Sequence, residues 1–316
     1  MPVISVLCPV YNEEKYIENV LRFFTLANPP EKDLFIIDGG SNDTTVEIVR
    51  SWMNKYPSIK LLYNPDKYVP HALNLGLRSS SGEIVVRLDA HTDYSPNYFE
   101  KIIETFITTG ADIVGGPMNP VGKTPLQKAI AYSTSGWFGI GDSKFHDINF
   151  NGYVDSVYLG AWKREIFNDV GYFDERMVRN QDDEFHYRAK SKGKKIYLNS
   201  EIKSNYFPRL SYSALFKQYF QYGLYKPLVL KKIKSEVKLR HLIPLFFVLY
   251  LLSLIASFAF PILFLPLLIY LAIDIYSSFI NNQRILIKLL SLLVYPTLHI
   301  SYGLGFLFGF SKLFRK

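Results

Sequence analysis

The sequence has very little cysteine, since Cys8 is the only one among 316 residues. A single thiol excludes a disulfide within the chain and any zinc site with more than one thiolate ligand. Cys8 lies in an apolar run that is typical of a strand. The scarcity of thiols fits a reducing compartment.

Several short motifs are also missing. No basic residues precede the first apolar run and Pro9 interrupts it, so we expect no signal peptide. No G-x-G-x-x-G follows this run, which excludes a Rossmann dinucleotide site. The Gly-Lys-Thr at 122–124 is no phosphate loop either, because Pro117 stands where that motif requires glycine.

Most of the long apolar runs lie after residue 240, so the chain divides into a soluble catalytic part and a membrane part. The net charge is +8, and much of the basic excess is concentrated in one segment. Basic residues cluster just before the apolar tail: Lys226, Lys231, Lys232, Lys234, Lys238 and Arg240. Such clusters attract anionic lipid and mark the cytoplasmic side of a membrane. We therefore expect a membrane as partner and no nucleic acid, whose binders spread basic residues over a face.

Short apolar runs alternate with helical patterns between residues 3 and 114. Strands are predicted at 3–10, 33–37, 59–63, 84–88 and 112–114, with helices between them. This alternation predicts an α/β fold with a doubly wound, mostly parallel sheet. Right-handed crossovers place Asp38 and Asp89 at one edge of that sheet, where open α/β sheets bind ligands. Asp38 can alternatively be a turn residue or a helix cap.

Asp89 and His91 follow a short, almost continuous apolar strand. A carboxylate and an imidazole spaced i, i+2 at a strand end can hold a divalent cation, and the cation can hold a diphosphate. The alternative is a strand end followed by a polar turn.

A second acidic group, Gln181-Asp-Asp-Glu184, begins a predicted helix. The helix dipole stabilises Asp182 and Asp183 as anions. The alternative interpretation is a solvated acidic first turn.

The chain from 211 onward has a different character. Residues 211–240 are aromatic, basic and amphipathic, which is typical of a helix lying in a membrane interface. Apolar stretches at about 242–260, 261–277 and 289–310 predict two to three membrane segments in residues 241–316. The basic residues that follow these stretches favour the cytoplasmic side. Three full crossings would place one basic group outside, so either one segment is re-entrant or the charge rule is broken.

Four motifs occur in order: Pro9-Val-Tyr-Asn-Glu13, Ile37-Asp-Gly-Gly-Ser-Asn-Asp-Thr44, Asp89-Ala-His91 and Gln181-Asp-Asp-Glu184. Together they resemble the inverting, nucleotide-sugar-dependent glycosyltransferases of family 2, which have the GT-A fold. Within that family the chain is similar to membrane-bound enzymes of exopolysaccharide assembly, of the succinoglycan glucosyltransferase type. The resemblance implies a GT-A domain at 1–210, followed by the interfacial segment at 211–240 and the membrane region at 241–316.

The resemblance also implies roles for individual residues on the donor side. Pro9, Tyr11 and Glu13 match the segment that contacts the nucleoside, and Asp38 matches the aspartate that reads the base. Asp89 matches the first carboxylate of a D-x-D motif, near ribose and metal. His91 stands where the second aspartate is usual, so the divalent metal is Mn²⁺ or Mg²⁺, with imidazole favouring manganese.

On the acceptor side the resemblance implies that Asp182 is the catalytic base, with Asp183 as its rival. Gln181 stands where the family has glutamate. Gln218 and Gln221 match a Q-x-x-R-W motif in which Gln221 replaces the arginine, and they belong to the acceptor or diphosphate side.

The implied function is hexosyl transfer, with inversion, from a nucleoside-diphosphate sugar to a polyprenyl-linked or other glycan acceptor in cell-surface polysaccharide or glycoconjugate synthesis. A UDP-sugar is the favoured donor. The expected location is the plasma membrane, as a multi-pass protein with a cytoplasmic catalytic domain. Two alternatives stay open: a sugar nucleotidyltransferase, which would need neither the base nor the tail, and an inactive membrane scaffold of a glycan assembly complex.

Overall fold

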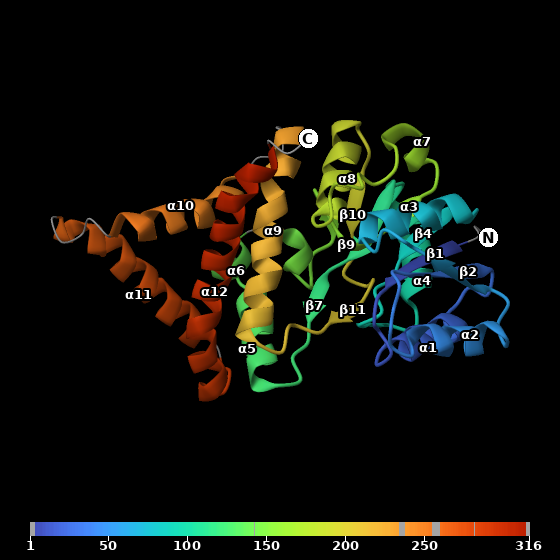
Figure 1. Ribbon diagram of the computed structural model, residues 1–316, viewed down its shortest axis with the longest axis horizontal. Helices are drawn as coiled ribbons and strands as arrows, with labels where there is room; N and C mark the ends of the chain where they lie inside the picture. Colours follow the sequence, from blue (N-terminus) through green and yellow to red (C-terminus); the bar gives the residue numbers. More distant parts are fainter. Residues whose placement is uncertain (1–3, 142, 234–237, 255–259, 281, 314–316) are drawn as a thin grey trace. The chain divides into compact units, whose positions relative to one another are not determined.

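The computed structural model describes residues 4–141, 143–233, 238–254, 260–280 and 282–313. The chain forms two units (Figure 1). Met1–Asn119 and Lys144–Tyr206 make up the first unit, and Pro120–Ser143 and Phe207–Lys316 make up the second. The return to the second unit at Phe207 lies near the boundary that the sequence places at 210. Residues 120–143, however, belong to the unit of the apolar helices, and the sequence analysis had kept them in the first domain.

The first unit is built on an eight-stranded sheet in the order β3-β2-β1-β4-β9-β6-β10-β8. A second, three-stranded sheet has the order β5-β11-β7. The strands are β1 (Ile4–Val10), β2 (Lys32–Asp38), β3 (Ile59–Tyr63), β4 (Ile84–Arg87), β5 (Thr92–Tyr94), β6 (Ile113–Gly116), β7 (Met118–Pro120), β8 (Gly152–Tyr153), β9 (Tyr158–Lys163), β10 (Ile196–Leu198) and β11 (Ser204–Tyr206).

Helices cover both faces of the large sheet. They are α1 (Ile17–Leu26), α2 (Thr45–Met53), α3 (Val69–Ser79), α4 (Tyr98–Thr109), α7 (Ile166–Val170) and α8 (Gln181–Ser191), with the 3-10 turn η1 (Lys144–His146). Successive residues of a strand point to opposite faces, so Val6 and Cys8 pack with α1, α2 and α4, whereas Leu7 packs with α3, α7 and α8. Each face thus has its own apolar core.

One central strand differs from the prediction. The half β3-β2-β1-β4 is parallel, but β9 pairs antiparallel with both β4 and β6. The sequence patterns had predicted no strand at 158–163. The sheet is still mostly parallel, as predicted.

The second unit is helical: α5 (Pro125–Ser135), α6 (Trp137–Ile140), α9 (Tyr212–Lys232), α10 (Leu239–Ser253), η4 (Pro261–Phe264), α11 (Leu265–Phe279), α12 (Ile285–Gly309) and η5 (Phe310–Leu313). Helix α5 begins at a capping box, in which Thr124 Oγ1 accepts from Gln127 N and Gln127 Oε1 accepts from Thr124 N. In Figure 1, α10 and α11 form a V that opens toward α12.

Two stretches, Pro261–Phe279 and Ile285–Leu313, are long and apolar enough to cross a membrane, and Leu239–Ser253 is a shorter apolar helix. They occupy most of the three stretches predicted at 242–260, 261–277 and 289–310. Residues 255–259 of the first stretch lie outside the described residues, as do Lys234, Arg315 and Lys316 of the basic groups.

Candidate functional site

The acidic motifs of the first unit gather at the carboxyl ends of the parallel strands. Val10 pairs with Asp38 across β1 and β2, and Leu7 pairs with Arg87 across β1 and β4. The loops that follow β1, β2 and β4 therefore leave the sheet at the same edge. Parallel register alone thus brings the first three motifs together.

The loops after β1 and β2 are joined by hydrogen bonds. Asn42 N donates to Asn12 Oδ1 at 2.9 Å, and Glu13 N donates to Thr45 Oγ1 at 2.8 Å. Asp38, which is 5% exposed, accepts from Gly40 N at 2.9 Å and from Ser41 Oγ at 2.5 Å. The Asp38 carboxylate therefore does organise the turn that follows it, as the alternative interpretation held.

Arg87 joins two of the predicted carboxylates. Its Nε donates to Asp89 Oδ1 at 2.9 Å, and its Nη1 donates to Asp182 Oδ2 at 2.6 Å. The side chain of Arg87 is only 9% exposed, whereas those of Asp89 and Asp182 are 18% and 28% exposed. A buried guanidinium thus holds the end of β4 and the start of α8 in one cluster.

The neighbouring carboxylates keep the Arg87 guanidinium protonated. Burial by itself would lower the pKa of the guanidinium, but the carboxylates of Asp182 and Asp89 outweigh burial and raise it. Arg87 is therefore permanently cationic, and a buried cation needs both of its partners. Loss of either carboxylate would leave the guanidinium less well compensated.

Tyrosines surround Asp89. Its backbone N donates to Tyr94 Oη at 2.7 Å, and the buried Tyr98 and the partly buried Tyr158 lie nearby. Burial, and then the negative charge of Asp89, raise the pKa of all three phenols. The phenols are therefore neutral at physiological pH and shield Asp89 from bulk water without adding charge.

The structure separates Asp182 from Asp183. Asp182 faces Arg87, and its Oδ1 is buried with no hydrogen-bond partner among the described residues. Asp183 instead accepts from Ser156 Oγ at 3.3 Å, and Ser156 Oγ also lies 2.9 Å from Nδ1 of His186. Burial lowers the pKa of His186, although both aspartates oppose this, so the imidazole is neutral near pH 7. Of the two aspartates, Asp182 is the one with a buried carboxylate oxygen that has no hydrogen-bond partner among the described residues.

The other predicted polar groups lie in different places. Gln181 is buried at the start of α8, with its Nε2 3.5 Å from Asp182 Oδ2. Gln218 and Gln221 belong to α9 of the second unit, where Gln218 Nε2 donates to Tyr222 Oη at 3.0 Å. Tyr11, in contrast, is half exposed next to the Asp38 loop, and Pro9 lies at the end of β1.

His91 pairs with a carboxylate other than the one predicted beside it. Its Nδ1 lies 3.2 Å from Glu13 Oε1. A carboxylate beside one ring nitrogen is the usual arrangement for histidines that bind a metal through the other. Glu13, which the resemblance assigned to the nucleoside, is thus placed to orient His91.

The acidic cluster offers few protein ligands for a divalent cation. Among the described residues, no three His, Cys, Asp or Glu side chains gather as metal ligands. The carboxylates of Glu13, Asp89 and Asp182, opposed by the single guanidinium of Arg87, nevertheless leave a formal surplus of two negative charges. Magnesium-like ions are commonly held by one or two carboxylates while substrate phosphates and water complete the shell. The cluster suits a cation that arrives together with a diphosphate.

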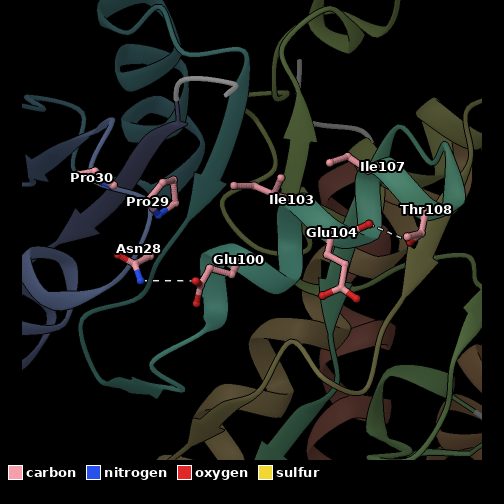
Figure 2. Close-up of a pocket in the computed structure, with 8 residues that line it drawn as sticks. All are labelled: Asn28, Pro29, Pro30, Glu100, Ile103, Glu104, Ile107 and Thr108. Carbon is pink, nitrogen blue, oxygen red and sulfur yellow. Dashed lines mark hydrogen bonds between the residues drawn. The ribbon is translucent and has the colours of Figure 1, made fainter.

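A pocket of about 450 Å³ lies elsewhere in the first unit. Asn28, Pro29 and Pro30 line it on one side, and Glu100, Ile103, Glu104, Ile107 and Thr108 of α4 line it on the other (Figure 2). Residues 28–30 precede β2, at the end of the strand opposite to Asp38. This pocket is therefore separate from the acidic cluster.

Sequence reasoning missed Arg87. It stands two residues before Asp89, on the same side of an extended strand, inside a run that is otherwise apolar. A basic residue at a buried strand position needs a partner, so the run Ile84-Val-Val-Arg-Leu-Asp89 contained a usable signal. The partner Asp182, 95 residues away, left no local trace.

Comparison with protein families identifies one match. The model of the family described as glycosyl transferase family 2 matches residues 5–171. The succinoglycan biosynthesis protein ExoA of Rhizobium meliloti (strain 1021) is 30% identical over 243 residues, which cover 76% of this chain and 74% of that protein. A dolichyl N-acetyl-alpha-D-glucosaminyl phosphate 3-beta-D-2,3-diacetamido-2,3-dideoxy-beta-D-glucuronosyltransferase of Methanococcus voltae is 28% identical over 300 residues, covering 91% and 89% of the two chains.

Solved structures with a similar fold have low sequence identity. The mannosyltransferase PcManGT from Pyrobaculum calidifontis, in complex with GDP-Man and Mn²⁺, has a TM-score of 0.57 at 18% identity, covering 95% of this chain and 74% of that one. TarS 1–349 of S. aureus in complex with UDP-GlcNAc has a TM-score of 0.51 at 17% identity, covering 95% and 91%. These neighbours are GT-A glycosyltransferases, and the predicted fold is confirmed.

Proposed function

Because the chain belongs to glycosyl transferase family 2 and is a glycosyltransferase, we propose that it moves a sugar, with inversion, from a nucleoside-diphosphate sugar to a lipid-linked glycan at a membrane. The observation that carries this proposal is the Arg87 bridge. It places the carboxylate at the end of β4, which suits a diphosphate and its cation, beside the carboxylate at the start of α8, which suits an acceptor hydroxyl.

Asp182 is the proposed base. The acceptor oxygen attacks the anomeric carbon, the new C–O bond forms as the bond to the diphosphate breaks, and the bonding electrons leave with the diphosphate. Asp182 Oδ1 takes the hydroxyl proton, for which it must lie about 2.6–3.2 Å from the acceptor oxygen. The assignment is supported by the free, buried Oδ1 atom, and Arg87 at Oδ2 holds the carboxylate in one orientation.

The direct displacement uses one carboxylate. No covalent glycosyl intermediate is required when the acceptor attacks the face opposite the leaving group, so the product has inverted anomeric configuration. The Asp183 carboxylate is already engaged by Ser156, which makes it a poor candidate for either base or nucleophile.

The donor is proposed to bind across the loops after β1, β2 and β4. Tyr11 and Pro9 would contact the nucleoside and Asp38 would read the base. Asp89 and His91 would hold a divalent cation, which would neutralise charge on the departing diphosphate. The titles of similar structures name GDP-Man with Mn²⁺ and UDP-GlcNAc, and a UDP-sugar is the donor proposed for this chain.

The acceptor is proposed to be membrane-bound. The name of the Methanococcus voltae relative contains a dolichyl phosphate sugar, and the second unit of this chain carries the apolar helices. Basic side chains before α10 and after α11 support a cytoplasmic location for the catalytic unit. Cell-surface polysaccharide or glycoconjugate synthesis is the process that such a reaction serves.

Release of free nucleoside diphosphate tests this function. The purified full chain, in detergent or lipid, is incubated with a panel of UDP- and GDP-sugars and Mn²⁺, with and without lipid extract as a source of acceptor. We expect diphosphate release from one donor, stimulated by the lipid. A nucleotidyltransferase would instead need pyrophosphate and form a nucleoside triphosphate, and a scaffold would release nothing from any donor.

The metal assignment makes a separate prediction. We expect His91→Ala to raise the Mn²⁺ concentration that gives half-maximal transfer, and His91→Asp to restore transfer while shifting the preference toward Mg²⁺. Glu13→Gln should raise the same Mn²⁺ requirement by about 10–100-fold, since it removes the carboxylate that orients His91. Metal titrations after EDTA treatment measure these effects. Full, EDTA-sensitive activity of His91→Ala at unchanged Mn²⁺ would show that His91 is not a ligand.

A further inference from the structure

Helices α9 and α12 of the second unit run parallel and in contact along their whole length. Near their starts, Tyr212 Oη donates to Leu290 O at 2.8 Å. Near their ends, Lys231 Nζ donates to Leu313 O at 3.3 Å. Between these points the two helices stay side by side, as Figure 1 shows. The two helices must therefore lie at about the same depth in a membrane.

Glycines fix this contact at close range. A Cβ added at Gly305 of α12 would lie 2.1 Å from Phe220 O, and one at Gly309 would lie 2.6 Å from Leu224 O. On α9, a Cβ at Gly223 would lie 2.1 Å from Tyr302 O. Small residues at such positions let two helix backbones approach closely, which is typical of helices packed at or in membranes. The pair therefore behaves as one rigid element.

Helix α9 is unsuited to the hydrocarbon layer. Lys217 is exposed in its second turn, Gln218 and Gln221 are partly exposed, and Lys231 and Lys232 are exposed at its end. Charged side chains inside a bilayer are costly and rare. The tyrosines among them are typical of the membrane–water interface.

Helix α12 is also covered on a further side. Ile287, Val294 and Leu298 pack against Ala129 and Ile130 of α5. His299 of α12 is held at both ring nitrogens, with Nδ1 2.9 Å from Tyr270 Oη and Nε2 2.8 Å from the carbonyl oxygen of Phe138 in α6. Helix α12 is thus covered in part by α5, α6 and α9, while Leu289 and Leu293 on its remaining surface stay exposed.

The V formed by α10 and α11 has a mainly apolar exposed surface. Its exposed side chains are large and apolar: Ile243, Phe246, Leu249 and Leu252 of α10, Phe260 and Ile262 before α11, and Leu265, Leu268, Ile269, Leu271, Ile275 and Tyr276 of α11. At about 1.5 Å per α-helical residue and about 2.0 Å per 3-10 residue, α10 spans about 22 Å and η4 with α11 about 30 Å, against about 30 Å of hydrocarbon. Because the two arms are inclined to one another (Figure 1), the V reaches less deep than either length.

Basic side chains lie near the start of α10, near the end of α11 and at both ends of α12. Arg240 lies at the start of α10, Arg284 and Lys288 lie at the start of α12, and Lys312 follows its end. Lys288 Nζ donates to Phe279 O at 3.1 Å, and Lys312 Nζ lies 4.4 Å from the Tyr225 ring centroid. A full crossing by α12 would separate these basic groups onto two sides of the membrane, against the positive-inside tendency.

From these observations we infer that the second unit is a one-sided membrane anchor: α9 and α12 lie together along the headgroup region, and only the α10–α11 hairpin dips into the hydrocarbon and returns to the same side. The partner is a lipid bilayer, with apolar chains around the hairpin and anionic headgroups around the basic ends. This proposal takes the re-entrant option that the sequence left open, in place of the multi-pass topology that the sequence predicts. The inference rests on the proposed function only for one point, namely that the side of the membrane from which the hairpin enters is the cytoplasmic side.

Site-directed cysteine labelling tests the topology in the full chain. Cys8 is fully buried in the first unit, so the unaltered chain is the unlabelled control. Exposed positions are changed one at a time: Asn54→Cys in the first unit, Asn282→Cys between α11 and α12, and Ser311→Cys after α12. A membrane-impermeant maleimide is applied to intact cells and then to opened membranes. We expect all three positions to react from the same face.

The possible results separate clearly. Labelling of Asn282→Cys and Ser311→Cys from opposite faces would show that α12 crosses, and the inference would be wrong. Phe260→Cys, at the tip of the hairpin, should resist the reagent from both faces and react only in detergent; reaction from the face opposite Asn54→Cys would mean that α10 and α11 both cross. The proposed function fails in a different way, by absence of transfer, and the labelling does not depend on activity.

Discussion

Replacing Asp182 with Asn is expected to lower the rate of sugar transfer by about 10²–10⁴-fold, the usual worth of a general base. Asparagine keeps the size of the side chain, and its Oδ1 can still accept from Arg87 Nη1, so the link to Asp89 survives. The variant loses the oxygen that can take the acceptor proton. Donor affinity should change little, and metal affinity should fall only modestly, because the proposed ligands Asp89 and His91 stay in place although one negative charge of the cluster is lost. Turnover and donor binding are measured separately.

The matched control is Asp183→Asn, one residue further along α8. Its carboxylate accepts from Ser156 and lies near His186, away from Arg87. We expect a much smaller loss of turnover. If Asp183→Asn is inactive and Asp182→Asn turns over normally, the base has been assigned one residue too early. If both variants are active, the single-base displacement has no base and the mechanism is refuted.

Replacing Asp89 with Ala is expected to abolish transfer, with a loss of about a thousandfold or more. Stabilisation of a leaving diphosphate by a bound cation is worth several kcal/mol, and each 1.36 kcal/mol is a factor of ten in rate. Unlike Asp182→Asn, this change should also weaken binding of the donor in the presence of Mn²⁺. Arg87 would lose its partner at the end of β4 and keep only Asp182.

Asp93→Ala is the control for this variant. Asp93 is exposed on β5, four residues after Asp89. Asp93→Ala therefore removes one negative charge near the site and leaves the contacts between Arg87, Asp89 and Asp182 intact. Its activity should match that of the unaltered chain. Thermal melting of both variants distinguishes lost chemistry from lost folding, since Asp89→Ala leaves a buried guanidinium less well compensated. Donor affinity that stays normal in a folded Asp89→Ala variant would remove Asp89 from the donor site.

Local patterns in the sequence were enough to predict the mostly parallel sheet and the acidic residues at its edge. Apolar runs, turn glycines and helical spacing are properties of short segments, and parallel register then brings the ends of β1, β2 and β4 together without further information. Four short motifs in order were sufficient for the family, which the comparisons confirm. The apolar stretches after residue 240 were visible for the same reason.

Only the tertiary structure decided which polar groups meet. Arg87 is bound to Asp182 across 95 residues, and His91 faces Glu13 across 78, and such pairs leave no periodicity in the sequence. The antiparallel direction of β9 depends on its neighbours β4 and β6, because the direction of a strand is not encoded in its own residues. The parallel packing of α9 on α12 likewise depends on distant glycines that fit opposing backbones. Composition alone made α12 a candidate membrane span, and only the tertiary structure showed that α5, α6 and α9 pack against part of its surface.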